Sequence, residues 1–128
     1  MKKYINIAFV LFILHTAEEA TFQFWQSDAS TLWASALTGL APASVYWIGQ
    51  FVAYLFLLLL LATRIGEQKW AQVLLGVVLV LEFQHLFVAL QPQHYEPGLV
   101  SGAVLGIFSL FYWRALYVLR GRPKSPIY

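Results

Sequence analysis

Long apolar stretches alternate with short polar connections along this chain. Four stretches have the length of roughly 20 residues that an α-helix needs to cross a bilayer. They cover Tyr4–Trp25, Ser44–Thr63, Trp70–Gln91 and Gly98–Leu119. The pattern predicts an all-α fold, in which residues 1–128 form one membrane domain built as a bundle of four transmembrane helices.

The connection between the first two stretches is long enough to hold a short helix. Residues 28–41 predict an interfacial helix that lies along the membrane surface, with Ser27 or Asp28 as its N-terminal cap. Pro42 is expected to end this helix. Its apolar face is formed by Leu32, Trp33, Leu37 and Leu40.

Composition supports lipid as the natural solvent of the chain. Hydrophobic residues make up 60% and charged residues only 11%, whereas a soluble domain carries about 25% charged residues. The chain has no cysteine, which excludes disulfides, thiolate metal sites and cysteine nucleophiles.

The basic residues all fall on one side of the predicted bundle. The connections over residues 26–43 and 92–97 contain neither Lys nor Arg. By the positive-inside rule, both termini are expected in the cytoplasm, so the protein is predicted to be a multi-pass protein of the cytoplasmic (inner) membrane. A net charge of +2 does not indicate nucleic-acid binding, because the charges follow topology instead of forming a patch. The basic residues are Lys2, Lys3, Arg64, Lys69, Arg114, Arg120, Arg122 and Lys124.

Five carboxylate and imidazole residues lie within the apolar stretches, where a charge costs roughly 2.5–3.5 kcal/mol near the bilayer centre. Because no Lys or Arg accompanies them at that depth, the three carboxylates must hold protons or bind a cation. These residues are His15, Glu18 and Glu19 in the first stretch and Glu82 and His85 in the third.

The two groups are expected at one depth. At about 1.5 Å rise per residue, His15 lies roughly 18 Å above Lys3, and Glu82 lies roughly 20 Å above Lys69. The first and third stretches run in the same direction, so an H-x-x-E face on one can meet an E-x-x-H face on the other. Gln50 of the second stretch falls at the same level.

Two kinds of chemistry fit this cluster. The first is a divalent-metal site for zinc, iron or manganese, with ligands drawn from His15, Glu18, Glu19, Glu82 and His85. The second is metal-free acid and base catalysis by Glu18, Glu19, Glu82 and His85. A purely structural use of these groups is the third interpretation.

Other residues are expected around the site or in helix packing. Gln50, His94, Glu96 and Ser101 are predicted to surround or cap the cavity. The fourth stretch carries a doubled G-x-x-x-G pattern, which lets another helix approach closely. This pattern suits packing within the chain or, alternatively, a homodimer seam. Its glycines are Gly98, Gly102 and Gly106.

The motifs resemble those of a known family. His15-Thr16-Ala17-Glu18-Glu19 resembles the signature of the HXXEE family of small bacterial membrane proteins. Glu82 and His85, and then Tyr95-Glu96-Pro97-Gly98 with Ser101, are similar to its second half, although we expect Asn and Thr where Glu82 and Ser101 stand. The resemblance supports the membrane fold and the site, and it implies no particular activity.

The sequence thus predicts a membrane-embedded enzyme that acts on a lipid or isoprenoid-like substrate, with a divalent metal or by acid and base catalysis. One alternative is a membrane protein that transports protons or metal ions, or senses metal. Another is a small structural subunit of a membrane complex.

Overall fold

The computed structural model describes residues 1–85 and 97–121, and the regular structure in these residues is helical throughout. The all-α prediction is therefore confirmed for the described part of the chain. Two of the elements, η1 and η2, are short 3-10 helices. In chain order the elements are α1 (Lys2–Thr21), η1 (Phe24–Gln26), α2 (Ala29–Thr38), α3 (Pro42–Ala62), η2 (Arg64–Glu67), α4 (Lys69–Leu81) and α6 (Leu99–Gly121).

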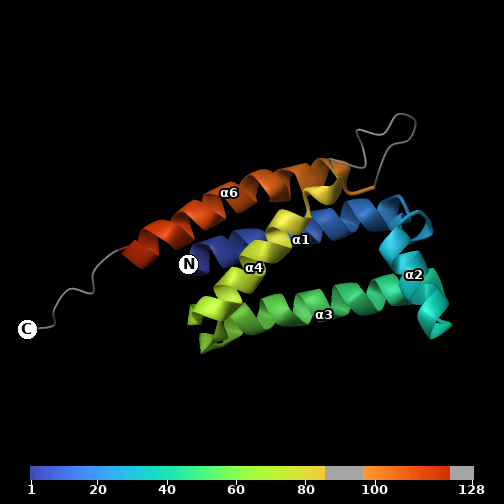
Figure 1. Ribbon diagram of the computed structural model, residues 1–128, viewed down its shortest axis with the longest axis horizontal. Coiled ribbons are helices and arrows are strands. Elements are labelled where there is room, and N and C mark those ends of the chain that lie inside the picture. Colours follow the sequence, from blue (N-terminus) through green and yellow to red (C-terminus); the bar gives the residue numbers. More distant parts are fainter. Residues whose placement is uncertain (86–96, 122–128) are drawn as a thin grey trace, which may run out of the picture.

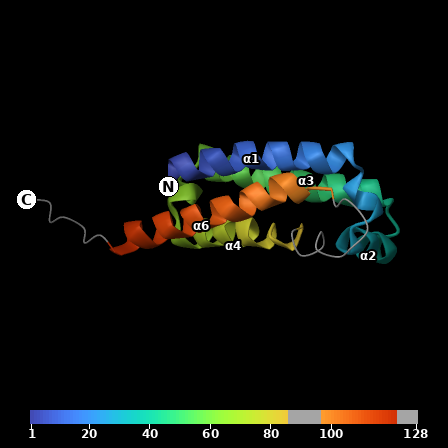
Figure 2. The same cartoon turned by 90° about the horizontal axis from the view of Figure 1, so that it is seen from above.

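The longer helices follow the long axis of the molecule (Figure 1). Helices α1 and α4 run in one direction, and α3 and α6 run in the other. The view from above shows α2 at the end where α1 stops and α3 begins (Figure 2). The N-terminus and the α3–α4 connection lie at the opposite end. We call these the α2 end and the N-terminal end of the bundle.

An apolar core joins α1, α3, α4 and α6 on the N-terminal side of the ionisable residues. Tyr112 is fully buried, and its hydroxyl donates a hydrogen bond to the Gln72 carbonyl over 2.8 Å. Gly76 lets the Trp113 ring lie against α4, because a Cβ there would stand 2.7 Å from the ring. The buried core residues are Ile5, Ala8, Phe12, Leu57, Leu60, Ala71, Leu75, Leu79, Leu105, Tyr112 and Leu116.

Asp28 begins α2 as its N-terminal cap, which is one of the two caps that the sequence predicted. Its carboxylate accepts hydrogen bonds from the Thr31 backbone N–H over 2.6 Å and from the Ser30 hydroxyl over 2.5 Å. Burial raises the pKa of Asp28, but these hydrogen bonds outweigh burial and leave the pKa below its usual value. The cap therefore stays ionised and keeps α2 in place.

The predicted end of α2 was wrong. The helix ends at Thr38, where Gly39 adopts a left-handed backbone with φ of 72°. Pro42 does not end α2 but occupies the first turn of α3, where a missing N–H removes no helical hydrogen bond. The expected apolar face of α2 is exposed at Leu32, Trp33, Leu37 and Leu40.

The third apolar stretch is not one continuous helix. Helix α4 ends at Leu81, and Glu82 and Phe83 form a turn. No Pro or Gly marks this break in the sequence. The turn instead fits against α6, where the Phe83 ring covers Gly106. Tertiary packing therefore decides where this helix ends.

Two described helices are long and apolar enough to cross a membrane. These are α3 over Pro42–Ala62 and α6 over Leu99–Val118. Only 17% and 33% of the residues in their apolar windows are buried, whereas the core helix of a soluble protein is mostly buried. This finding gives partial support to a membrane location.

Candidate metal centre

His15 and Glu19 lie one turn apart on the inner face of α1. Both residues are 3% exposed. Their spacing of four residues places them on the same side of the helix, and His15 Nε2 lies 3.3 Å from Glu19 Oε1.

Glu82 and His85 reach the same place from the turn that follows α4. Glu82 Oε2 lies 3.0 Å from His15 Nε2 and 3.6 Å from His85 Nε2. His85 Nε2 also lies 3.7 Å from Glu19 Oε1. Two imidazole nitrogens and two carboxylate oxygens thus converge, as the equal depths of the two motifs predicted.

Three of these residues have the geometry of metal ligands. Ligand atoms of His15, Glu19 and His85 all lie within 4.8 Å of one another. Two ligand atoms bound at about 2.1 Å in a tetrahedral site are about 3.4 Å apart, and the two distances that Glu19 Oε1 makes to the imidazoles, 3.3 and 3.7 Å, bracket this value. The trio could therefore hold a divalent metal ion.

Glu82 differs from the trio in its exposure. Its side chain is 14% exposed, against 4% for His15 and Glu19 and 3% for His85. The cluster is therefore less covered at Glu82 than at its other three residues.

Glu19 is oriented by two residues of α3. Its Oε2 accepts hydrogen bonds from the Tyr46 hydroxyl over 3.1 Å and from Gln50 Nε2 over 3.2 Å. Gln50 Oε1 in turn accepts from the Thr16 hydroxyl over 3.0 Å. These contacts leave Oε1 of Glu19 facing the imidazoles, which is how residues behind a ligand fix its direction. Gln50 thus lies beside the cluster through its contact with Glu19, and its expected service to a site stays a prediction.

Sequence reasoning missed the residues around Gln50. Tyr54 donates to Thr16 over 2.7 Å, and Tyr46 contacts Glu19 directly. Tyr46, Gln50 and Tyr54 recur every fourth residue, so they share one face of α3. That stripe of polar residues within an apolar helix was the feature of the sequence that could have revealed them.

Glu18 turns away from the trio and caps α6. Its carboxylate accepts hydrogen bonds from the backbone N–H groups of Val100 (3.2 Å) and Ser101 (2.8 Å) and from the Ser101 hydroxyl (2.5 Å). A carboxylate at a helix N-terminus satisfies unpaired N–H groups and complements the helix dipole. Glu18 thus contacts the start of α6 beside the cluster. Its expected role as a ligand or catalytic group stays a prediction.

Ser101 connects Glu18 to His15 and selects the tautomer of the imidazole. The Ser101 Oγ lies 2.8 Å from His15 Nδ1. Because the Ser101 proton is given to Glu18, its oxygen accepts from Nδ1–H of His15. With Nδ1 as the donor, Nε2 of a neutral imidazole would carry the lone pair that a metal ligand needs. Ser101 thus lies against His15, and its expected service to a site stays a prediction.

We expect Ser101→Ala to lower divalent-metal affinity about 10- to 100-fold, because the imidazole loses the contact that fixes its tautomer and direction. Competition with a chelating dye measures the affinity. Ser101→Thr keeps the hydroxyl and should restore binding. Ser109→Ala is the matched control, since buried Ser109 lies on the same helix and donates its hydroxyl hydrogen bond to the Gly106 carbonyl. Equal affinity in Ser101→Ala and wild type would show that Ser101 does not orient His15.

Gly98, just before α6, and Gly102 within α6 contact the clustered residues within the chain. A Cβ at Gly98 would stand 2.8 Å from His15 Cε1, and a Cβ at Gly102 would stand 3.0 Å from His85 Cδ2. Gly106 lies under Phe83. This is the packing use of the G-x-x-x-G pattern, and a homodimer through the same glycines stays a prediction.

Two predicted cavity residues, His94 and Glu96, lie outside the described residues. The remaining candidates have been placed above. Those that meet in one cluster are His15, Glu19, Glu82 and His85.

Comparison with known proteins gives one match. A family model described as "protein of unknown function with HXXEE motif" matches residues 6–113. The match therefore includes His15, Glu19, Glu82 and His85. No curated protein and no solved structure matches the chain.

Proposed function

Since this chain belongs to the family of proteins of unknown function with an HXXEE motif, we propose its function from the chemistry of its own site. We infer a membrane-embedded, divalent-metal-dependent enzyme that acts on a lipid or isoprenoid-like substrate. The carrying observation is the convergence of His15, Glu19 and His85 at metal-ligand spacing, with Glu82 on the less covered side.

The membrane part of the proposal is a four-span bundle with cytoplasmic termini in the inner membrane. The apolar, largely exposed helices α3 and α6 support it. So does the charge distribution, because Lys2, Arg64 and Lys69 lie on elements at the N-terminal end of the bundle. The site then lies in the outer half of the bilayer.

A reporter fused after Tyr128 tests this topology. We expect an enzyme that is active only in the cytoplasm to work there, and one that is active only in the periplasm to fail. The same pair fused within residues 28–41 should give the opposite result. Periplasmic activity after Tyr128 would contradict the four-span arrangement.

The metal part assigns different work to the four clustered residues. His15, His85 and Glu19 would bind the ion, and two nitrogens with one oxygen suit zinc, iron or manganese. A metal in such a site polarises its ligands and lowers the pKa of bound water. Glu82 would accept a proton from that water, since its carboxylate contacts the cluster and retains some exposure.

The surroundings of the site suit a lipid-like substrate. A cavity of about 420 Å³ lies between α2 and α3 and is lined by Tyr46 and Gln50, which hold Glu19. An apolar groove of about 270 Å³ runs between α1 and α6 along Leu11 and Leu14 as far as Glu18, Ser101 and Val104. These openings support access from the membrane and its outer surface. The apolar core beyond the site favours an enzyme over an ion path through the bundle.

An activated long-chain ester, such as the 4-nitrophenyl ester of a fatty acid, is the probe for this function. We expect the zinc-loaded protein to hydrolyse it, and Glu82→Gln to reduce the rate by about 10²- to 10⁴-fold while the metal is retained. Glu67→Gln changes an exposed carboxylate at the other end of the bundle and serves as the control.

Two results would redirect the proposal. Loss of metal from Glu82→Gln would make Glu82 a ligand instead of the base. Full activity in metal-free protein would favour the acid and base version of the site, in which the 3.0 Å pair of His15 and Glu82 transfers the proton.

A further inference from the structure

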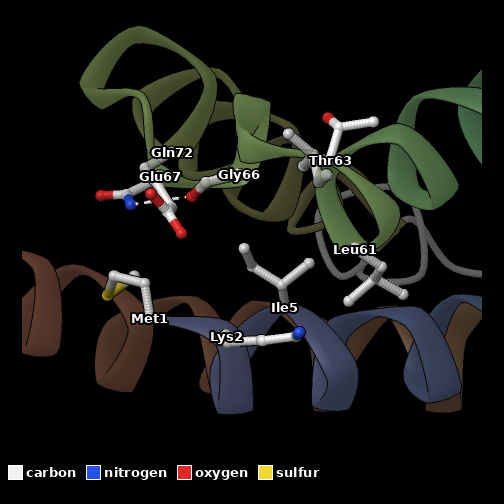
Figure 3. A pocket seen from close by; sticks show the side chains of 9 residues that line it. Met1, Lys2, Ile5, Leu61, Thr63, Gly66, Glu67 and Gln72 are labelled. Carbon is white, nitrogen blue, oxygen red and sulfur yellow. Dashed lines mark hydrogen bonds between the residues drawn. The ribbon is translucent and has the colours of Figure 1, made fainter.

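A second cavity lies at the N-terminal end of the bundle, remote from the metal site. It has a volume of about 340 Å³ and lies between the start of α1, the end of α3, η2 and α4. Figure 3 shows α1 on one wall and the α3–α4 connection on the other. Its floor is apolar where Ile5, Leu60 and Leu61 line it.

Opposite charges face this cavity from its two walls. Lys2 lies on α1, and Glu67 points from η2 toward α1 (Figure 3). Within residues 1–85 and 97–121, the ion pairs are those of the metal-site histidines, so Lys2 and Glu67 are not paired with each other. The cavity thus separates a cation from an anion across open space.

The wall that carries Glu67 is fixed by local contacts. Gln72 Nε2 donates to the Gly66 carbonyl over 2.9 Å, and the Thr63 hydroxyl accepts from the Ile65 N–H over 3.1 Å. Gly66 lies so close to α3 that a Cβ there would stand 2.1 Å from the Leu60 carbonyl oxygen. These contacts therefore fix the position of Glu67 relative to α1.

We propose that this cavity binds the headgroup of a zwitterionic aminophospholipid of the phosphatidylethanolamine type. The lipid phosphate would pair with Lys2, and its ammonium would donate hydrogen bonds to Glu67. The apolar floor would take the start of an acyl chain. The inference rests on the membrane placement proposed above, which puts this end at the cytoplasmic headgroup layer, and it is independent of the metal.

The charge pattern selects among lipids. An anionic headgroup without an amine would bring its charge close to Glu67, which repels it. A quaternary ammonium, as in phosphatidylcholine, has no N–H to donate to a carboxylate. A headgroup with a primary ammonium and a phosphate therefore complements the opposite charges on the two walls.

Native mass spectrometry of the detergent-purified full chain tests the proposal. The probes are phosphatidylethanolamine, phosphatidylcholine and phosphatidylglycerol with identical acyl chains. We expect phosphatidylethanolamine to be retained about threefold to tenfold more strongly than the other two. Lys2→Gln should weaken its retention, and Glu67→Gln should remove the preference over phosphatidylcholine.

Lys3→Gln is the matched control, since Lys3 is exposed beside Lys2 but does not line the cavity. It should leave retention unchanged. Metal content, measured on the same samples, should be equal in all variants and reports that they fold. Equal retention of the three lipids by the wild type, or an equal loss in Lys2→Gln and Lys3→Gln, would overturn the proposal.

Discussion

His15→Ala is expected to remove stoichiometric divalent metal from the purified protein, with a loss of affinity of more than about 100-fold. The estimate is a lower bound, because removing a residue that merely supports a ligand already costs about 10- to 100-fold. His15 Nε2 lies within reach of both Glu19 and Glu82, so its loss leaves the buried Glu19 carboxylate and the less buried Glu82 carboxylate with one neighbouring imidazole, that of His85, instead of two. Elemental analysis after purification without chelator measures the metal.

His85→Ala should have the same effect, since His85 supplies the second imidazole. Gln84→Ala is the matched control, because Gln84 is the exposed neighbour of His85 in the chain. Metal that persists in both histidine variants would place the ion elsewhere. A wild type without metal under these conditions would leave acid and base catalysis as the function of the cluster.

Gly98→Ala is expected to damage the site more than any other change of a single methyl group. Gly98 has φ of 87°, which costs a residue with a Cβ about 1–2 kcal/mol. Its Cβ would also stand 2.8 Å from His15, 3.1 Å from His85 and 3.2 Å from Glu19. Overpacking of this kind costs about 1–3 kcal/mol, so the sum is about 2–5 kcal/mol together with loss of metal.

Gly39→Ala separates the two contributions. Gly39 has a similar φ of 72°, but nothing lies within 4 Å of its Cβ position. This variant should therefore show only the backbone cost and keep its metal. Thermal unfolding in detergent and metal content are measured for both proteins. Equal destabilisation of Gly98→Ala and Gly39→Ala, with metal retained in both variants, would mean that the residues around Gly98 move to make room for the methyl group.

The meeting of the two motifs could be predicted because it depends on regular geometry. Helical rise sets the height of His15 and Glu82, and alternating helix direction makes those heights comparable. The four-residue spacing of His15 and Glu19 then gives a shared face. Nothing beyond periodicity and topology was required.

The separate fate of Glu18 could not be predicted in this way. Glu18 and Glu19 are adjacent on the same helix, where Glu19 is buried and Glu18 is half-buried. Their roles diverge because the start of α6 presents N–H groups to one of them, while Tyr46 and Gln50 hold the other. Such partners are set by how helices distant in sequence approach one another.

The break in the third apolar stretch had the same kind of cause. The composition around Glu82 is compatible with a continuous helix, and only the contact of Phe83 and His85 with Gly102 and Gly106 favours a turn. The doubled G-x-x-x-G was visible in the sequence. The residues that pack against these glycines were not visible, because a glycine pattern marks where a close approach occurs but not which residues approach.

The bond between Glu18 and Ser101 has a consequence for biosynthesis. The two residues are separated by 83 positions in the chain. At roughly 5–20 residues per second, ribosomes need about 4–17 seconds to bring the second out after the first. During that interval the Glu18 carboxylate lacks the α6 groups that it later contacts, whereas Tyr46 follows Glu19 after only 27 positions. In the membrane placement proposed above, the first helix would need a wet or protected place, such as the insertion machinery, until α6 is made.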